Sequence, residues 1–156
     1  MDKKQSLTIV IAYLSIMLAI IIFLSINLIV YPLGAFENFR LLFSCSLIGG
    51  VGGVLYCFRG VYLNHSVKDQ WSDKWIPWYL IRPIVSLICG GVSYLFLKAS
   101  LLVLEAQKEG DASNLGFYTL AFIAGMNVDR FIEKIEDLAH ATWGIGRSRS
   151  TTTKDN

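Results

Sequence analysis

Residues Leu7 to Tyr31 read LTIVIAYLSIMLAIIIFLSINLIVY, a run of 25 positions without a charged side chain. A helix of that length rises about 37 Å, enough to cross a hydrocarbon core of roughly 30 Å with some tilt. Lys3 and Lys4 precede the run, as they would in a secretory signal peptide, but the run is too long for such a peptide and lacks a small-residue cleavage pattern. We therefore predict a transmembrane helix over residues 7–31.

The composition of the whole chain also favours lipid as its solvent. Hydrophobic residues make up 54% of the 156 positions and charged residues only 17%, so mean hydropathy is +0.51. A soluble domain of this size needs more polar surface. The net charge of +2 is too balanced for a nucleic-acid-binding surface. We expect an all-α, polytopic integral membrane protein in contact with the lipid bilayer and not with nucleic acid.

Three further apolar stretches predict spans over about 41–63, 79–104 and 115–139. The last contains only 14 uncharged residues, 115–128, which would rise about 21 Å and fall short of the membrane thickness. Because the 3.6-residue pattern continues to Ala139, we predict one long helix, half in lipid and half in the cytoplasm. Gly144 and Gly146 would end it, leaving residues 144–156 as a disordered cytoplasmic tail.

Small side chains identify the second and third spans as contact helices. Ser46 and Gly50 lie four residues apart, as do Gly49 and Gly53, and this spacing lets two helix backbones approach closely in lipid. The third span carries a similar small-residue face. We expect the two spans to pack together through Ser46, Gly49, Gly50, Gly53, Ser86, Gly90 and Gly91.

Tryptophans mark one membrane interface. Trp71, Trp75 and Trp78 have the spacing of one helical face within the polar segment after the second span. Tryptophan prefers the headgroup layer, where its ring is half buried and its N–H stays hydrated. We predict a short interfacial helix over about 66–76, with these three residues and Trp143 as interfacial anchors.

The distribution of lysine and arginine selects the orientation. Four spans place both termini on one side, and that side carries eleven cations against three on the other. The eleven are Lys3, Lys4, Arg59, Lys68, Lys74, Arg82, Arg130, Lys134, Arg147, Arg149 and Lys154, and the three are Arg40, Lys98 and Lys108. Positive charge is retained on the cytoplasmic side, so we expect a multi-pass plasma-membrane protein with both termini in the cytoplasm.

Lys98 lies seven residues before Glu105, roughly 10 Å inside the predicted end of the third span. A lysine at this depth has two possible interpretations. Its side chain could extend to the outer headgroups along an apolar stem. Alternatively, a ring of such cations could line an aqueous path in an oligomer and favour anions.

Charges of both signs follow the fourth apolar stretch, at Asp129, Arg130, Glu133, Lys134 and Asp137. A solvated helix with i,i+4 ion pairs is the simplest interpretation. The alternatives are a docking surface for a cytosolic partner and the inner vestibule of a pore.

Residues with catalytic or metal-binding chemistry are not grouped in the sequence. Cys45, Cys57 and Cys89 lie inside apolar runs without CxxC spacing, which predicts buried free thiols. His65 and His140 lack a ligand pattern around them. The predicted spans contain no carboxylate pair, HExxH motif or Ser/Lys dyad, so we expect no cofactor and no enzymatic activity.

One motif resembles a known group of proteins. The segment 78–83, Trp-Tyr-Leu-Ile-Arg-Pro, is followed by Gly90-Gly91 and later by Ala-Phe-Ile-Ala-Gly at 121–125. Together these resemble small bacterial four-helix membrane proteins with an aromatic-x-x-Arg-Pro entry into one span and an Ala-Phe-x-x-Gly element at the end of the last span. The resemblance covers residues 71–138 and implies a bacterial inner-membrane protein of four helices, but no activity.

Two functions fit these features. The first is a homo-oligomeric membrane module that signals, conducts or permeabilises, for example in stress or phage defence, supported by the glycine-rich spans and the polar residues at membrane depth. The second is an anchor or accessory subunit whose C-terminal helix, after residue 128, recruits a cytosolic partner.

Overall fold

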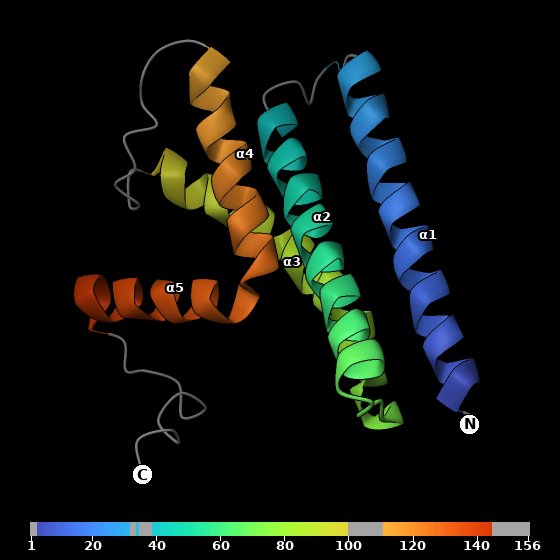
Figure 1. The fold of residues 1–156 in the computed structure, drawn as a ribbon. Helices are drawn as coiled ribbons and strands as arrows, with labels where there is room; N and C mark the ends of the chain where they lie inside the picture. Colours follow the sequence, from blue (N-terminus) through green and yellow to red (C-terminus); the bar gives the residue numbers. More distant parts are fainter. Residues whose placement is uncertain (1–2, 32–33, 35–38, 100–110, 145–156) are drawn as a thin grey trace.

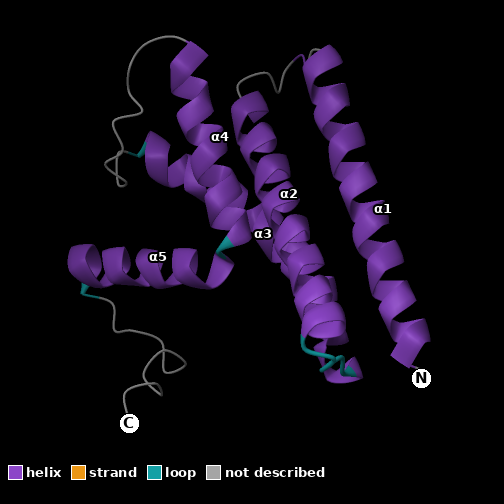
Figure 2. Ribbon diagram, in the orientation of Figure 1, coloured by secondary structure: helices purple, strands orange, loops and turns teal. Residues whose placement is uncertain are grey.

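The computed structural model describes residues 3–31, 34, 39–99 and 111–144, with the side chains of 3 and 111–113 excepted. Within these ranges the regular secondary structure is all helical, without strands (Figure 2). Five α-helices, α1 Lys3–Val30, α2 Arg40–Tyr62, α3 Ile76–Lys98, α4 Asp111–Met126 and α5 Val128–Trp143, are joined in part by a π-helical turn, Leu63–Val67, and a 3₁₀ turn, Asp73–Trp75.

Three of these helices are long and apolar enough to cross a membrane, over Lys4–Val30, Arg40–Val67 and Asp73–Lys98. The apolar part of α4, Asn114–Met126, is shorter. Helix α4 has 16 residues and rises about 24 Å. The prediction of an all-helical chain with several long apolar helices is therefore confirmed.

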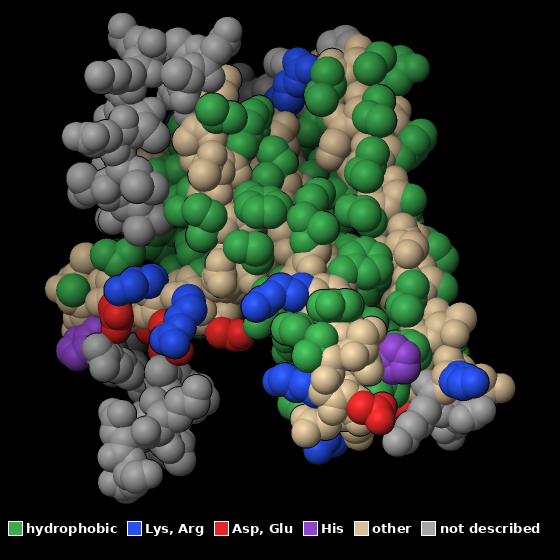
Figure 3. Space-filling view, viewed as in Figure 1, with side chains coloured by type: hydrophobic (Ala, Val, Ile, Leu, Met, Phe, Trp, Pro, Cys, Tyr) green, Lys and Arg blue, Asp and Glu red, His purple; other side chains and the backbone are tan. Residues whose placement is uncertain are grey.

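The first four helices alternate in direction and both described ends of the chain lie toward the same end of the molecule (Figure 1). Helix α2 contacts α1, α3 and α4, and so forms the centre of the structure. In the space-filling view, charged side chains gather at the lower end and along α5, and a broad hydrophobic surface lies above them (Figure 3). This division matches a protein with one charged membrane face and an apolar belt.

The predicted interfacial helix over 66–76 is wrong. Residues 68–72 leave the helical path, with Asp69 at φ 48° and Ser72 extended at φ −140°. The irregular segment turns Trp71 inward, where its indole stacks on Tyr79 at a centroid distance of 5.6 Å. Burial of this ring therefore overrides the helical spacing of the tryptophans.

The predicted continuous helix over 115–139 is also wrong. Helix α4 ends at Met126, Asn127 adopts φ −118° and ψ 51°, and α5 starts at Val128 and turns away from the direction of α4 (Figure 1). The 3.6-residue pattern does continue through α5, but its apolar face would have no cover if the helix simply extended into water. The turn directs that face toward the apolar belt instead.

The remaining helix ends lie close to or beyond the predicted ones. Helix α3 begins at Ile76, before the predicted start at 79, with Pro77 in its first turn, where the absent proline N–H costs nothing. Positions 100–104 of the predicted third span and positions 145–156 of the predicted tail lie outside the described residues. Gly144 caps α5 in the left-handed conformation at φ 65°, and its N–H donates to the His140 carbonyl.

Candidate functional site

Arg82 and Asp129 form an ion pair at the corner where α3 meets the first turn of α5. Nη1 of Arg82 lies 2.8 Å from Oδ2 of Asp129. The side chain of Arg82 is only 6% exposed, whereas that of Asp129 is 73% exposed. A buried guanidinium is costly unless it is paired, so this contact both compensates Arg82 and fixes the start of α5. Asp129 also lies in the first turn of α5, where negative charge favours the helix dipole.

Two aromatic rings complete the surroundings of Arg82. The guanidinium carbon lies 4.8 Å from the ring centre of Tyr56 and 5.3 Å from that of Trp78. Cation–π attraction at desolvated sites reaches about 2 kcal/mol. Nε of Arg82 is buried without a hydrogen-bond partner. The arginine therefore contacts one carboxylate and two ring faces, which come from α5, α2 and α3.

Ser86, one turn further along α3, links this corner to α4. Its hydroxyl hydrogen is shared between the Arg82 carbonyl at 2.9 Å and the Gly125 carbonyl at 2.8 Å. Ser86 is fully buried, and Gly53 of α2 leaves the space that it occupies. The start of α3 and the end of α4 are thus joined directly beside the turn at Asn127.

The structure brings all the predicted small packing residues into contacts between helices of the same chain. A methyl group added at Gly49 would lie 2.6 Å from the Cα of Gly90, so the α2 and α3 backbones touch there. Gly91 faces Ser46 in the same interface. Gly50 instead faces Leu87 and, in part, Ile21 of α1, and Gly53 faces Ser86.

Sequence reasoning did not identify the participation of α4 in this packing. An added methyl group at Gly125 would overlap the backbone of Gly49, and one at Gly52 would lie 2.5 Å from the Phe122 carbonyl oxygen. Gly125 belongs to the Ala-Phe-x-x-Gly element of the resemblance, which was its only signal.

The four predicted interfacial tryptophans occupy different environments. Trp71 is buried, and its Nε1–H donates to the hydroxyl of Ser6 at 2.9 Å, which connects it to α1. Trp78 packs edge-on against Tyr79. Trp75 is 46% and Trp143 66% exposed, as a ring in contact with headgroups would be.

The other charged candidates lie apart from the Arg82 corner. Nζ of Lys98, at the end of α3, lies 5.8 Å from the ring centre of Tyr94, and the side chain is exposed. Arg130 pairs with Glu133 at 3.0 Å on the surface of α5. Asp137 and Lys134 are also exposed on α5. Only Asp129, among the predicted docking residues, joins the interhelical ion pair described above.

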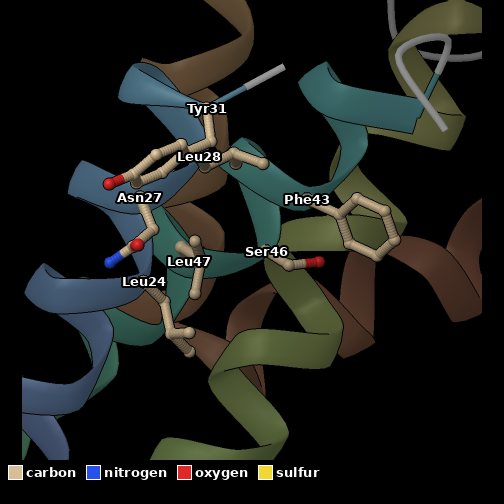
Figure 4. A pocket seen from close by; sticks show the side chains of 7 residues that line it. All are labelled: Leu24, Asn27, Leu28, Tyr31, Phe43, Ser46 and Leu47. Carbon is tan, nitrogen blue, oxygen red and sulfur yellow. The ribbon is translucent and has the colours of Figure 1, made fainter. Parts of the chain in front are cut away.

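A cavity of about 480 Å³ separates the upper parts of α1 and α2 (Figure 4). Its lining is mainly apolar, with Asn27 and Ser46 as its polar members. Asn27 Nδ2 donates to the Phe23 carbonyl of its own helix at 2.8 Å. The amide is therefore satisfied locally, and the cavity resembles a gap between two helices in lipid more than a ligand site.

Metal and thiol chemistry find no support in the described ranges. No group of three or more His, Cys, Asp or Glu side chains there could hold a metal ion. Cys45, Cys57 and Cys89 are buried free thiols, as the sequence predicted.

Comparison with protein-family models, with curated proteins and with solved structures gave no match.

Proposed function

We propose that this protein is a small multi-pass protein of the bacterial inner membrane, and that it acts as an anchor or accessory subunit that presents α5 to a cytosolic protein partner. The observation that carries this proposal is the Arg82–Asp129 pair, which ties the start of α5 to the helix bundle. A helix fixed in this way is a built part of the fold, unlike a solvated extension.

The two faces of α5 support a position along the cytoplasmic surface of the membrane. Phe131, Ile135 and Leu138 share one side of the helix, while Glu133 and Asp137 lie on the other. A helix with such a division settles in the interface with its apolar side toward the acyl chains. Its acidic side then faces the cytosol and can be read by a basic surface of a partner.

A homo-oligomeric module that signals, conducts or permeabilises is the second candidate. One observation favours it: α1 leaves large side chains such as Ile16, Phe23 and Ile29 exposed over most of its length, a surface that a second copy could cover. The small-residue faces, which would serve such a contact most simply, are already used between helices of one chain. We therefore rank the anchoring function first.

Site-specific photo-cross-linking in intact cells distinguishes the two candidates. A photoreactive residue replaces Asp137 on the acidic face, and the matched control replaces Ile135 two residues away on the apolar face. The anchor proposal predicts a defined heteromeric product from position 137 alone. The absence of any protein adduct from position 137 would contradict the anchor proposal. A cross-linked dimer of this chain from probes at Ile16 or Phe23 would favour the oligomeric module.

A further inference from the structure

The crook between α4 and α5 contains a second cavity, of about 220 Å³. Leu120 and Ile123 of α4 and Phe131, Ile135 and Leu138 of α5 form its apolar wall. Two apolar helix faces converge here because the chain turns at Asn127. The cavity is partly open rather than enclosed, so a hydrocarbon chain can enter it.

Cations edge this apolar wall. Arg130 and Lys134, one turn apart on α5, are the charged residues among the described ones that line the cavity. Only their alkyl stems do so, because the cavity surface is wholly apolar, and their charged ends extend past its rim. The acidic side chains of α5 lie further around the helix and do not line it. Arg130 pairs with Glu133 at 3.0 Å, but this pair is exposed, and exposed pairs contribute little, so the guanidinium can transfer to a stronger anion. Phosphate is such an anion, since it accepts two hydrogen bonds from one guanidinium.

We infer that this crook binds one acyl chain of an anionic phospholipid against Leu120, Ile123 and Ile135, with the lipid phosphate between Arg130 and Lys134. With α4 along the membrane normal and α5 in the plane of the interface, the apolar wall lies at the depth of the acyl chains. The two cations then lie at the depth of the phosphates. The apolar and cationic parts of the site thus match the acyl chain and the phosphate of a phospholipid, both in chemistry and in depth.

The dimensions of the cavity favour a lipid over a peptide. An α-helix with its side chains is about 10–12 Å across, which a cavity of about 220 Å³ cannot enclose. A single hydrocarbon chain is much thinner. Free phosphate would satisfy the cations but would leave the apolar wall uncovered, so it is expected to bind far more weakly than the lipid.

This inference depends on the proposed membrane position of α5 and is independent of the protein partner. It goes beyond the anchoring function because it assigns α5 a specific lipid. A bound anionic lipid would also hold α5 flat and leave its acidic face turned to the cytosol.

Native mass spectrometry of the full chain, released from detergent, tests the site directly. The protein is titrated with phosphatidylglycerol and with phosphatidylcholine of the same acyl chains, and we expect a preference for the first bound phosphatidylglycerol. Replacing both cations, Arg130→Gln with Lys134→Gln, should reduce this preference about fivefold per cation, since each basic residue near a charged lipid surface contributes roughly that factor. The matched control is Lys74→Gln, which removes an exposed cation at the same end of the molecule and should leave the preference unchanged.

A second variant separates the apolar wall from the cations. Ile123→Trp should fill the crook and reduce binding of both lipids while the cations remain. Inorganic phosphate at the lipid concentration should not displace the lipid. Equal affinity for the two lipids, or equal loss in Lys74→Gln and in the double variant, would overturn the inference while leaving the anchor proposal intact. A chain that stays in solution without detergent would overturn both.

Discussion

Helix α2 meets α3 and α4 backbone to backbone, whereas α1 meets α2 mainly through long side chains and leaves most of its own surface uncovered. The first interface depends on the absence of side chains, at positions such as Gly49, Gly90 and Gly125. The second depends on a few interlocked aliphatic residues, including Val10 and Leu14.

Hydrogen bonds also attach α1 to the rest of the described structure. The Tyr13 hydroxyl donates to the Leu80 carbonyl at 2.9 Å, and Trp71 donates to Ser6. Near the other end, an Arg40 guanidinium nitrogen donates to the Ile29 carbonyl at 3.0 Å. The comparison indicates that α2, α3 and α4 form the part of the molecule least tolerant of added volume, and that α1 can move more easily.

The largest expected effect follows from adding volume at the backbone contact. Gly125→Leu should destabilise the protein by about 3 kcal/mol or more, because the neighbour it would displace is the Gly49 backbone, which cannot rotate away. Unfolding in mixed micelles, followed by circular dichroism, measures the loss. Ala19→Leu on the exposed side of α1 is the control and should change stability by less than about 0.5 kcal/mol. Similar effects at the two positions would remove the distinction between the interfaces.

A smaller effect is expected at the corner that joins α5 to the tight unit, which is the closely packed group of α2, α3 and α4. Asp129→Ala removes the charged hydrogen bond to Arg82 and should cost about 1–2 kcal/mol, less than a fully buried pair because Asp129 is largely exposed. Hydrogen exchange should increase in α5 but not in α2. Lys134→Ala, at an exposed position on the same helix, is the control and should leave exchange unchanged. Unaltered protection of α5 in Asp129→Ala would show that the pair does not anchor the helix.

The substitution Trp71→Phe tests how α1 is attached to the rest of the protein. The variant keeps the stacked ring but loses the hydrogen bond to Ser6, and we expect a cost of about 1 kcal/mol. Faster hydrogen exchange confined to the first half of α1 is the measured signature. Trp75→Phe, at an exposed position, provides the comparison. Faster exchange throughout α2 and α3 would mean that α1 is integral to the tight unit.

The smallest effect is expected at Lys98. Its exposed ammonium group makes a cation–π contact with Tyr94, which contributes about 0.5 kcal/mol in water. Lys98→Leu should therefore change stability by no more than that amount and leave ion flux through liposomes unaltered. A clear fall in anion flux would support the pore interpretation in place of the snorkelling one.

The sequence was most informative where one property dominates a long stretch. The predicted first and second spans, 7–31 and 41–63, differ from α1 and α2 by four residues or fewer at each end. Long uncharged stretches, 7–31 and 41–58, dominate both, and a helix satisfies backbone hydrogen bonds within the segment itself. The spacing of small residues likewise identified the faces of α2 and α3 that meet.

Sequence reasoning was least informative where a contact distant in the chain decides local structure. Trp71 follows the spacing of an interfacial helix, but the burial of its ring against Tyr79 breaks that helix. The turn at Asn127 lies beside an ion pair between residues 47 positions apart, Arg82 and Asp129. Neither charge has a local pattern that identifies the other, so this site was accessible only from the fold.

Spin-label accessibility along α5 tests the central claim most directly. Single nitroxide labels are placed at successive positions from 129 to 142, in lipid bilayers and in a chain whose three cysteines are replaced by alanine, and oxygen and nickel-complex accessibilities are measured. The account predicts a 3.6-residue oscillation about one constant depth, with positions 131, 135 and 138 in lipid and 133 and 137 in water. A steady increase in water exposure from 129 to 142, without oscillation, would contradict it and restore a helix that leaves the membrane upright.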